Sequence, residues 1–189
     1  LTKYANNAFL ATKVSFINTI ANICQNLEGA DVTTVAAAIG LDKRIGSLYL
    51  NAGLGYGGSC LPKDVKALVN FSTNGLAYYP SLIAEADNVN SVQPLKAVDL
   101  VRRALGGLGR KRIAVLGLSF KPNTDDMRDA VSIPIIKSVL GEGATVAVYD
   151  PMAIENARSI FGDKIDYAND VIECIEKADC CMMVTEWDQ

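Results

Sequence analysis

The sequence predicts an α/β protein in which an all-helical central region is followed by a doubly wound parallel sheet domain. Two observations predict this class. Apolar residues recur at helical spacing through most of the first hundred residues, and beyond residue 111 short apolar runs alternate with helical patterns. A glycine-rich stretch, residues 106–111, separates the two patterns. We therefore expect two domains, residues 1–107 and residues 108–189.

The first two helices are predicted from periodicity and caps. A helix over residues 1–27 is apolar on most sides, but Lys3 and Asn7 break that pattern near its start. These two polar residues stand four apart, so they share one face of the helix. A second helix over residues 32–39 follows Asp31, which is a good N-cap.

Two further helices complete the helical region. One opens at Pro62 and ends near residue 75, since proline is tolerated in the first turn of a helix. The other covers residues 80–105, where Pro94 is expected to bend or interrupt it.

Strands and helices alternate in the second domain, which is the pattern of a parallel sheet covered by helices. We expect strands at residues 113–116, 145–149 and 181–184, and helices at residues 131–140, 152–160 and 171–175.

Composition excludes several functional classes. The net charge of −3 gives no basic footprint for nucleic acid, and no apolar run is long enough to cross a membrane. Five cysteines without a C-x-x-C pair favour reduced thiols and a cytoplasmic location. The chain contains no histidine, so it can build neither a Ser-His-Asp triad nor a histidine-ligated metal site, and we expect no metal.

The run Gly-Tyr-Gly-Gly-Ser-Cys-Leu-Pro-Lys-Asp places Cys60 between a glycine-rich turn and a proline-opened helix. Glycines let a ligand approach the backbone closely. A helix N-terminus favours a thiolate and can hold an oxyanion. Asp64 follows one helical turn later and can reach the same site. This pattern favours a nucleophilic Cys60, although a buried cysteine in an ordinary glycine turn would show similar spacing.

The turn after the first predicted strand lacks the G-x-G-x-x-G dinucleotide fingerprint and reads Gly-Leu-Ser-Phe-Lys-Pro. Ligands of such sheets nevertheless bind beyond the carboxyl ends of the strands. Lys121 and Arg128 fall there in one loop and could clamp a phosphate, or they could belong to a solvated rim. Asp150 ends the next strand and carries the same two interpretations.

Several segments, taken together and in order, resemble the UDP-glucose/GDP-mannose dehydrogenase family, and the resemblance covers the whole chain. The segments are Lys3-Tyr4-Ala5-Asn6-Asn7-Ala8-Phe9-Leu10-Ala11, Arg44-Ile45-Gly46, Gly55-Tyr56-Gly57-Gly58-Ser59-Cys60, Pro62-Lys63-Asp64, Gly117-Leu118-Ser119-Phe120-Lys121, Asp125-Asp126-Met127-Arg128, Tyr149-Asp150-Pro151 and Thr185-Glu186-Trp187-Asp188.

The resemblance implies an NAD-dependent enzyme that oxidises the C6 alcohol of a nucleotide sugar to a carboxylate in two steps. Cys60 is then the nucleophile that attacks the C6 aldehyde and forms a thiohemiacetal and a thioester. Lys3, Asn7 and Asp64 match the residues that bind and polarise the C6 oxygen and an active-site water. UDP-glucose is the favoured substrate and GDP-mannose the alternative.

The resemblance also implies the remaining contacts. Substrate-binding positions are Arg44, Tyr49, Leu50, Gly57, Phe120 and Lys121, and positions that touch NAD are Lys63 and Arg128.

The second domain of such an enzyme is Rossmann-like and binds the UDP-sugar. Family members pair as homodimers, in which Arg44 reaches substrate across the interface. They begin with an NAD-binding domain that carries the fingerprint missing here. This chain begins inside a helix with Leu1, so we expect it to be an inactive fragment of an active enzyme. A non-catalytic nucleotide-sugar-binding or dimerisation module is the alternative of another class.

Overall fold

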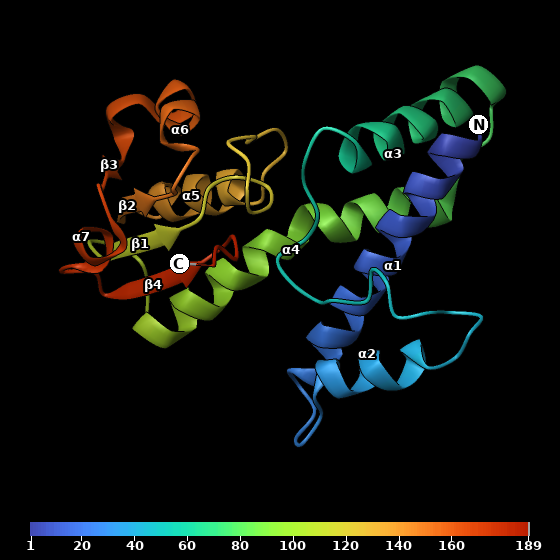
Figure 1. Cartoon of the computed structure of the whole chain (residues 1–189), viewed down its shortest axis with the longest axis horizontal. Coiled ribbons are helices and arrows are strands. Elements are labelled where there is room, and N and C mark those ends of the chain that lie inside the picture. Colours follow the sequence, from blue (N-terminus) through green and yellow to red (C-terminus); the bar gives the residue numbers. More distant parts are fainter. Residues whose placement is uncertain (189) are drawn as a thin grey trace. The chain divides into compact units, whose positions relative to one another are not determined.

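The computed structural model describes residues 1–188, which form two compact units, residues 1–93 and residue 94 onward (Figure 1). The units meet inside α4 (Ser81–Leu105), between Gln93 and Pro94. The sequence places the boundary later, in the glycine-rich stretch at residue 107.

The first unit is built from helices. It contains α1 (Thr2–Cys24), α2 (Val32–Gly40), α3 (Leu61–Asn70), the π-helical turn η1 (Phe71–Gly75) and the first part of α4. Ala8 and Ala11 on α1 are buried against Val65 on α3 and against Tyr56. Small side chains on α1 let α3 approach closely, which brings the starts of the two helices together.

The helix boundaries differ from expectation in two places. Helix α1 ends at Cys24, three residues before the predicted end, because Gln25 begins a series of turns. Helix α4 continues through Pro94, so the predicted interruption is wrong, whereas a bend at this proline stays a prediction.

The second unit is a four-stranded parallel sheet with helices between its strands. Its elements are β1 (Arg112–Leu116), α5 (Ser132–Gly141), β2 (Thr145–Tyr149), α6 (Ile154–Phe161), the 3₁₀ turn η2 (Gly162–Lys164), β3 (Asp166–Tyr167), α7 (Val171–Ile175) and β4 (Cys180–Met183). The strand order is β3-β2-β1-β4, and all three pairings are parallel. The order reverses direction between β1 and β4, which is where such sheets bind ligands.

Both faces of the sheet are covered. Ala114 and Ala147 pack with Cys174 of α7 on one face. Val115 and Val148 alternate onto the opposite face and are fully buried as well, and α5 contacts the same two strands. The predicted class, a helical region followed by a parallel α/β sheet, is confirmed. Strand β3 was not predicted.

Across residues 1–188, no helix combines the length and the apolar character that crossing a bilayer requires.

Candidate active site

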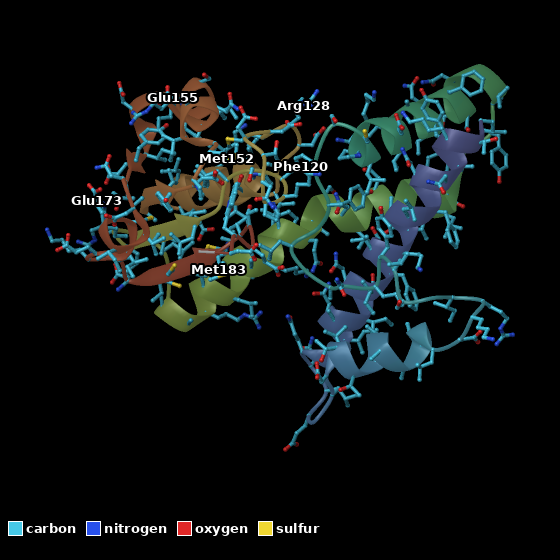
Figure 2. All side chains as sticks on the ribbon, viewed as in Figure 1. Phe120, Arg128, Met152, Glu155, Glu173 and Met183 are labelled. Atoms are coloured by element: carbon cyan, nitrogen blue, oxygen red, sulfur yellow. The ribbon has the colours of Figure 1, made fainter. Side chains whose placement is uncertain are left out.

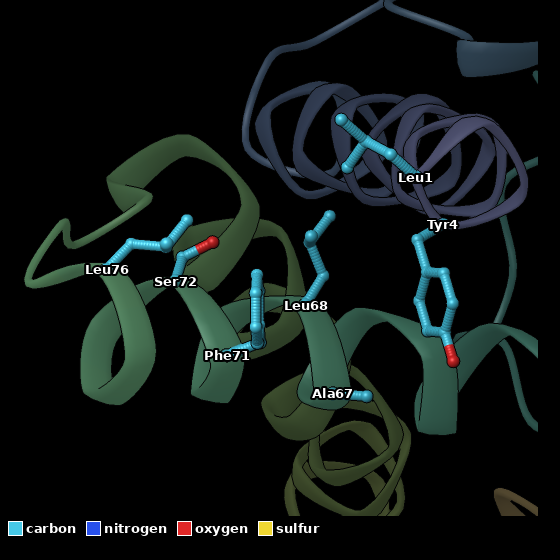
Figure 3. A pocket seen from close by; sticks show the side chains of 7 residues that line it. All are labelled: Leu1, Tyr4, Ala67, Leu68, Phe71, Ser72 and Leu76. Carbon is cyan, nitrogen blue, oxygen red and sulfur yellow. The ribbon is translucent and has the colours of Figure 1, made fainter.

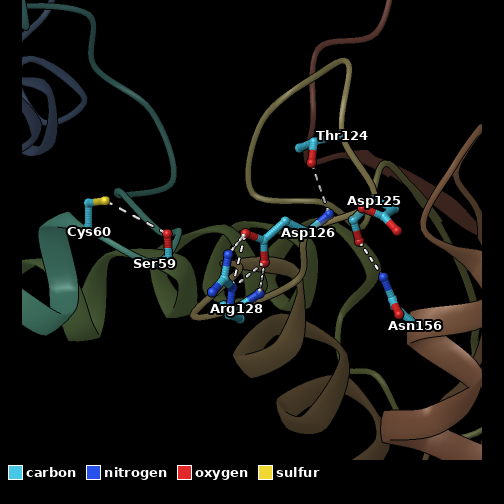
Figure 4. Close-up of polar contacts among 7 residues, drawn as sticks. All are labelled: Ser59, Cys60, Thr124, Asp125, Asp126, Arg128 and Asn156. Atoms are coloured by element: carbon cyan, nitrogen blue, oxygen red, sulfur yellow. Dashed lines mark hydrogen bonds and ion pairs between the residues drawn. The ribbon is translucent and has the colours of Figure 1, made fainter.

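Cys60 is the N-cap residue of α3, and its side chain is exposed. The helix begins at Leu61, so Pro62 occupies its second position, where a missing N–H is harmless. The Cys60 carbonyl accepts a hydrogen bond from the Asp64 backbone N–H at 2.9 Å. Its Sγ lies 3.7 Å from Ser59 Oγ (Figure 4). The thiol therefore sits at a helix N-terminus and is open to solvent, as a nucleophile requires.

Asp64 carries the buried carboxylate of this site. Its side chain has no exposed surface, and its Oδ2 accepts a hydrogen bond from Asn7 Nδ2 at 2.8 Å. Lys3 Nζ lies 3.1 Å from the same oxygen. The structure thus brings Lys3, Asn7 and Asp64 together, because α1 and α3 pack side by side at their starts.

The other oxygen of Asp64 is less well satisfied. Oδ1 is buried and has no hydrogen-bond partner, and Lys63 Nζ lies 3.9 Å away from it. A buried carboxylate oxygen without a donor has free lone pairs, so it is a natural acceptor for a water or a substrate hydroxyl.

Charge at this site is fixed by the ion pair. The hydrogen bond from Lys3 lowers the pKa of Asp64 below its ordinary value, against the opposing effect of burial. The same bond raises the pKa of Lys3, and the nearby Cys60 acts in the same direction. At neutral pH the site therefore holds an ammonium group and a carboxylate close to a thiol.

The loop before α3 carries the other predicted substrate positions of this unit. Leu50 is buried, whereas Tyr49 is exposed and adopts a φ of 64°, and Gly57 lies in the turn before Cys60. Arg44 is exposed, and its guanidinium pairs with the Asp42 carboxylate, with Nη2 of Arg44 lying 2.6 Å from Oδ2 of Asp42.

Three side-chain amides hold this loop, and sequence reasoning missed them. Asn90 Oδ1 accepts from the Tyr56 N–H, and Asn90 Nδ2 donates to the Tyr56 carbonyl. Asn18 Oδ1 accepts a hydrogen bond from the Gly53 N–H, and Gln93 Nε2 donates one to the Gly53 carbonyl. The polar residues stand at helical spacing on α1 and α4, but a single sequence gives no sign of what they bind.

In the second unit, the predicted residues lie on the loop between β1 and α5. Phe120 and Arg128 come from this loop (Figure 2), and Lys121 Nζ lies 5.5 Å from the centroid of the Phe120 ring. Arg128 makes a two-armed contact with the Asp126 carboxylate (Figure 4), which lowers the pKa of Asp126.

Asp150 is a second feature that sequence reasoning underestimated. It lies at the carboxyl end of β2, and only 2% of its surface is exposed. Its Oδ2 accepts from the backbone N–H groups of Leu118 and Ser119 and from Trp187 Nε1, at 2.7, 3.1 and 3.2 Å. Its Oδ1 accepts from the N–H groups of Met152 and Ala153 at 2.9 and 2.8 Å. Asp150 is a buried hydrogen-bond centre and not a solvated rim charge.

An apolar cavity beside the start of α1 does not coincide with these residues. A space of about 570 Å³ lies between the start of α1 and the end of α3, lined by Tyr4, Leu68, Phe71 and Leu76 among others (Figure 3). None of the predicted catalytic side chains lines it.

Comparisons with known proteins match both parts of this chain. Residues 1–92 match the model of the UDP-glucose/GDP-mannose dehydrogenase family, central domain, and residues 114–189 match its UDP binding domain. The chain is 47% identical to the UDP-glucose 6-dehydrogenase YwqF of Bacillus subtilis and 48% identical to AglM of Haloferax volcanii. These alignments cover 98% and 99% of this chain but only 42% and 43% of the relatives.

Two solved dehydrogenase structures also resemble this chain in fold. A UDP-glucose dehydrogenase from the hyperthermophilic archaeon Pyrobaculum islandicum matches with a TM-score of 0.95 and 42% identity, over 99% of this chain and 43% of that one. A GDP-mannose dehydrogenase from Pseudomonas aeruginosa matches with a TM-score of 0.64 and 30% identity, over 98% of this chain and 44% of that one.

Proposed function

Because this chain belongs to the UDP-glucose/GDP-mannose dehydrogenase family, we propose that it is the substrate-handling part of an NAD-dependent enzyme that oxidises UDP-glucose to UDP-glucuronate. The observation that carries the proposal is the exposed Cys60 thiol at a helix N-terminus, beside the Lys3–Asn7–Asp64 cluster. The two relatives reported above align with nearly the whole of this chain, and both are named UDP-glucose 6-dehydrogenase.

The first oxidation converts the C6 alcohol of the sugar to an aldehyde. Bound NAD would supply the hydride acceptor for each of the two oxidations at C6. Lys3 provides an ammonium group that stabilises negative charge on the C6 oxygen as its proton departs. The free Oδ1 of Asp64 can hold a water that takes up this proton.

Cys60 acts on the aldehyde. Its thiolate attacks C6, a C–S bond forms, and the carbonyl electron pair moves to oxygen to give a thiohemiacetal. Loss of the second hydride from C6 leaves a thioester. Water then adds to the thioester carbon, the C–S bond breaks, and the thiolate leaves as the carboxylate forms. In this proposal the Asp64 Oδ1 accepts a proton from that water, a role supported by its lack of a hydrogen-bond donor among the described residues.

The fit of NAD to this chain is partial. The sheet of the second unit lacks the dinucleotide fingerprint, and the N–H groups of Leu118 and Ser119 already bind Asp150. We therefore assign NAD to a separate domain, with Lys63 and Arg128 contacting it from this side as exposed cations. The chain spans 42% to 43% of its relatives' length, and we expect it to produce no NADH alone.

Each unit carries its own proposed contacts to the UDP-sugar. Tyr49, Leu50 and Gly57 belong to the loop before Cys60, and Phe120 with Lys121 offers a ring and a cation to the nucleotide sugar.

We also propose a homodimer in which Arg44 reaches the partner's substrate. Support comes from Phe9, Phe16 and Ile23, which recur every seven residues on α1 with more than half of each residue exposed. Helix α2 is apolar and has no buried residue. Such faces are usually covered by another chain.

The test is NADH production by the full-length protein that contains this chain. We expect turnover on UDP-glucose that exceeds turnover on GDP-mannose. Cys60→Ser should abolish the overall oxidation, while the control Cys181→Ser, which alters an exposed cysteine of the other unit, should not. Undiminished carboxylate formation by Cys60→Ser would refute the mechanism. Binding of UDP-glucose without turnover in the wild type would instead favour the non-catalytic module.

A further inference from the structure

The loop that carries Cys60 is held by an amide clamp, which consists of the side chains of Asn18, Asn90 and Gln93. Residues 51–60 belong to no helix or strand in the part of the chain that the structure describes. We propose that Asn90 is a positioning residue that sets the location of Cys60 for attack on the C6 carbon. This inference rests on the proposed function for its kinetic consequence, but the clamp itself can be tested without it.

Asn90 pairs with the Tyr56 backbone as a neighbouring strand would. Its Oδ1 accepts from the Tyr56 N–H at 2.7 Å, and its Nδ2 donates to the Tyr56 carbonyl at 3.0 Å. One side chain thereby satisfies both backbone groups of one residue. The turn is also pressed against this amide, since a Cβ added at Gly55 would lie 2.7 Å from Asn90 Oδ1.

The other two side chains of the clamp, Asn18 and Gln93, bind the backbone of Gly53. Its N–H donates to Asn18 Oδ1 at 2.7 Å, and its carbonyl accepts from Gln93 Nε2 at 2.9 Å. Asn22 Nδ2 in turn donates to Gln93 Oε1 at 3.0 Å, which fixes the orientation of that amide. Asn18 has no exposed surface and Gln93 is 6% exposed, so water does not compete easily for these bonds.

The clamp determines where Cys60 begins. Three residues separate Tyr56 from Cys60, and Gly58 among them has a φ of 86°. The Tyr56 ring is buried against Ala8 and Val65, so α1 and α3 hold the same residue whose backbone Asn90 binds. With one end of this short segment fixed at Tyr56 and the other at the start of α3, the thiol has little freedom to move.

Loss of the clamp should therefore affect chemistry more than binding. A nucleophile displaced by about 1 Å can lose about 100-fold in rate. In the full-length enzyme, we expect Asn90→Ala to lower kcat for UDP-glucose by about 10- to 100-fold while KM changes less than about twofold. Asn90→Asp keeps the acceptor for the Tyr56 N–H but sets a carboxylate oxygen against the Tyr56 carbonyl, so it should lower kcat as well.

The matched control is Asn88→Ala. Asn88 is exposed on the same helix and its side chain donates to Glu85, away from the loop. It should leave kcat and KM unchanged.

Hydrogen exchange of this chain tests the clamp independently. In Asn90→Ala the amides of residues 53–60 should exchange faster, while those of α4 stay protected, which shows that the unit is folded. Unchanged exchange in residues 53–60 would overturn the clamp. Faster exchange with kcat within about twofold of wild type, or a raised KM at constant kcat, would overturn the positioning role.

A third readout separates this inference from the proposed function. If the wild-type enzyme has no dehydrogenase activity, the proposed function fails, and the rate of Cys60 alkylation by iodoacetamide becomes the measure of its position. Asn90→Ala should then change this rate at least about fivefold relative to Asn88→Ala, measured on the Cys60 peptide. Equal rates in the two variants would refute the positioning role.

Discussion

Replacing Asp150 by asparagine should strongly destabilise the second unit. Two N–H groups face its Oδ1, and three N–H groups and the Ser119 hydroxyl face its Oδ2. An amide offers one oxygen, so however it turns, at least two buried N–H groups lose their acceptor. Each such loss costs about 1–3 kcal/mol, and the bonds that remain lose the charge of the carboxylate. We expect Asp150→Asn to lower the free energy of unfolding by about 3–5 kcal/mol.

The chain offers a local probe for this measurement. Trp187 is its single tryptophan, and Nε1 of that ring donates to Asp150. Urea unfolding followed by tryptophan fluorescence therefore reports on the second unit without a signal from the first. Asp163→Asn changes an exposed aspartate of the same unit and should stay within about 0.5 kcal/mol of wild type. A loss below about 1 kcal/mol in Asp150→Asn would show that water or rearrangement satisfies these donors.

Two further predictions concern the loop after β1 and the ion pair at Cys60. Gly117→Ala should lower the urea midpoint of the second unit by the equivalent of about 1–3 kcal/mol. Gly117 has a φ of 87°, and an added Cβ would lie 2.5 Å from the Thr185 backbone nitrogen. An unchanged midpoint would contradict the close approach of the loops that follow β1 and β4. The folded-state pKa of Asp64 is lowered, so its stabilising contribution is present above its unfolded value of 3.8 and is lost as the pH falls through the folded pKa. The difference in melting temperature between wild type and Asp64→Asn should therefore be constant near neutral pH and narrow at pH values below 3.8, and a difference that widens on acidification would reverse the assigned sign.

The elements that repeat a pattern over many residues could be predicted from the sequence. Helices α1, α2 and α4 have long apolar stripes, and β1 and β2 are continuous apolar runs, so local periodicity was sufficient. Strand β3 has two residues, which is too short to show an alternation. Pro94 was expected to bend or interrupt α4, and the helix continues through it because a proline removes only one hydrogen bond from a helix of 25 residues.

The candidate site was partly accessible to the same reasoning. The glycine turn, Pro62 and Asp64 indicated a thiol at a helix start from spacing alone, and the structure places Cys60 there. The family resemblance, and not spacing, brought Lys3 and Asn7 to it. Asn90 and Asp150 could not be assigned, because their partners are backbone groups of distant loops. A side chain that binds backbone leaves no complementary residue type in the sequence.

The way β1 and β4 end limits what can be built on this sheet. The strand order is the one on which dinucleotides are usually carried, yet the residues after these two strands touch one another at Gly117 and Thr185, and a carboxylate already sits where a pyrophosphate would lie. To make this sheet bind a nicotinamide cofactor, one would have to replace Asp150, introduce glycines in the turn after β1 and separate the loops that follow β1 and β4. Changing the fingerprint residues alone would leave two negative charges competing for the same few amide protons.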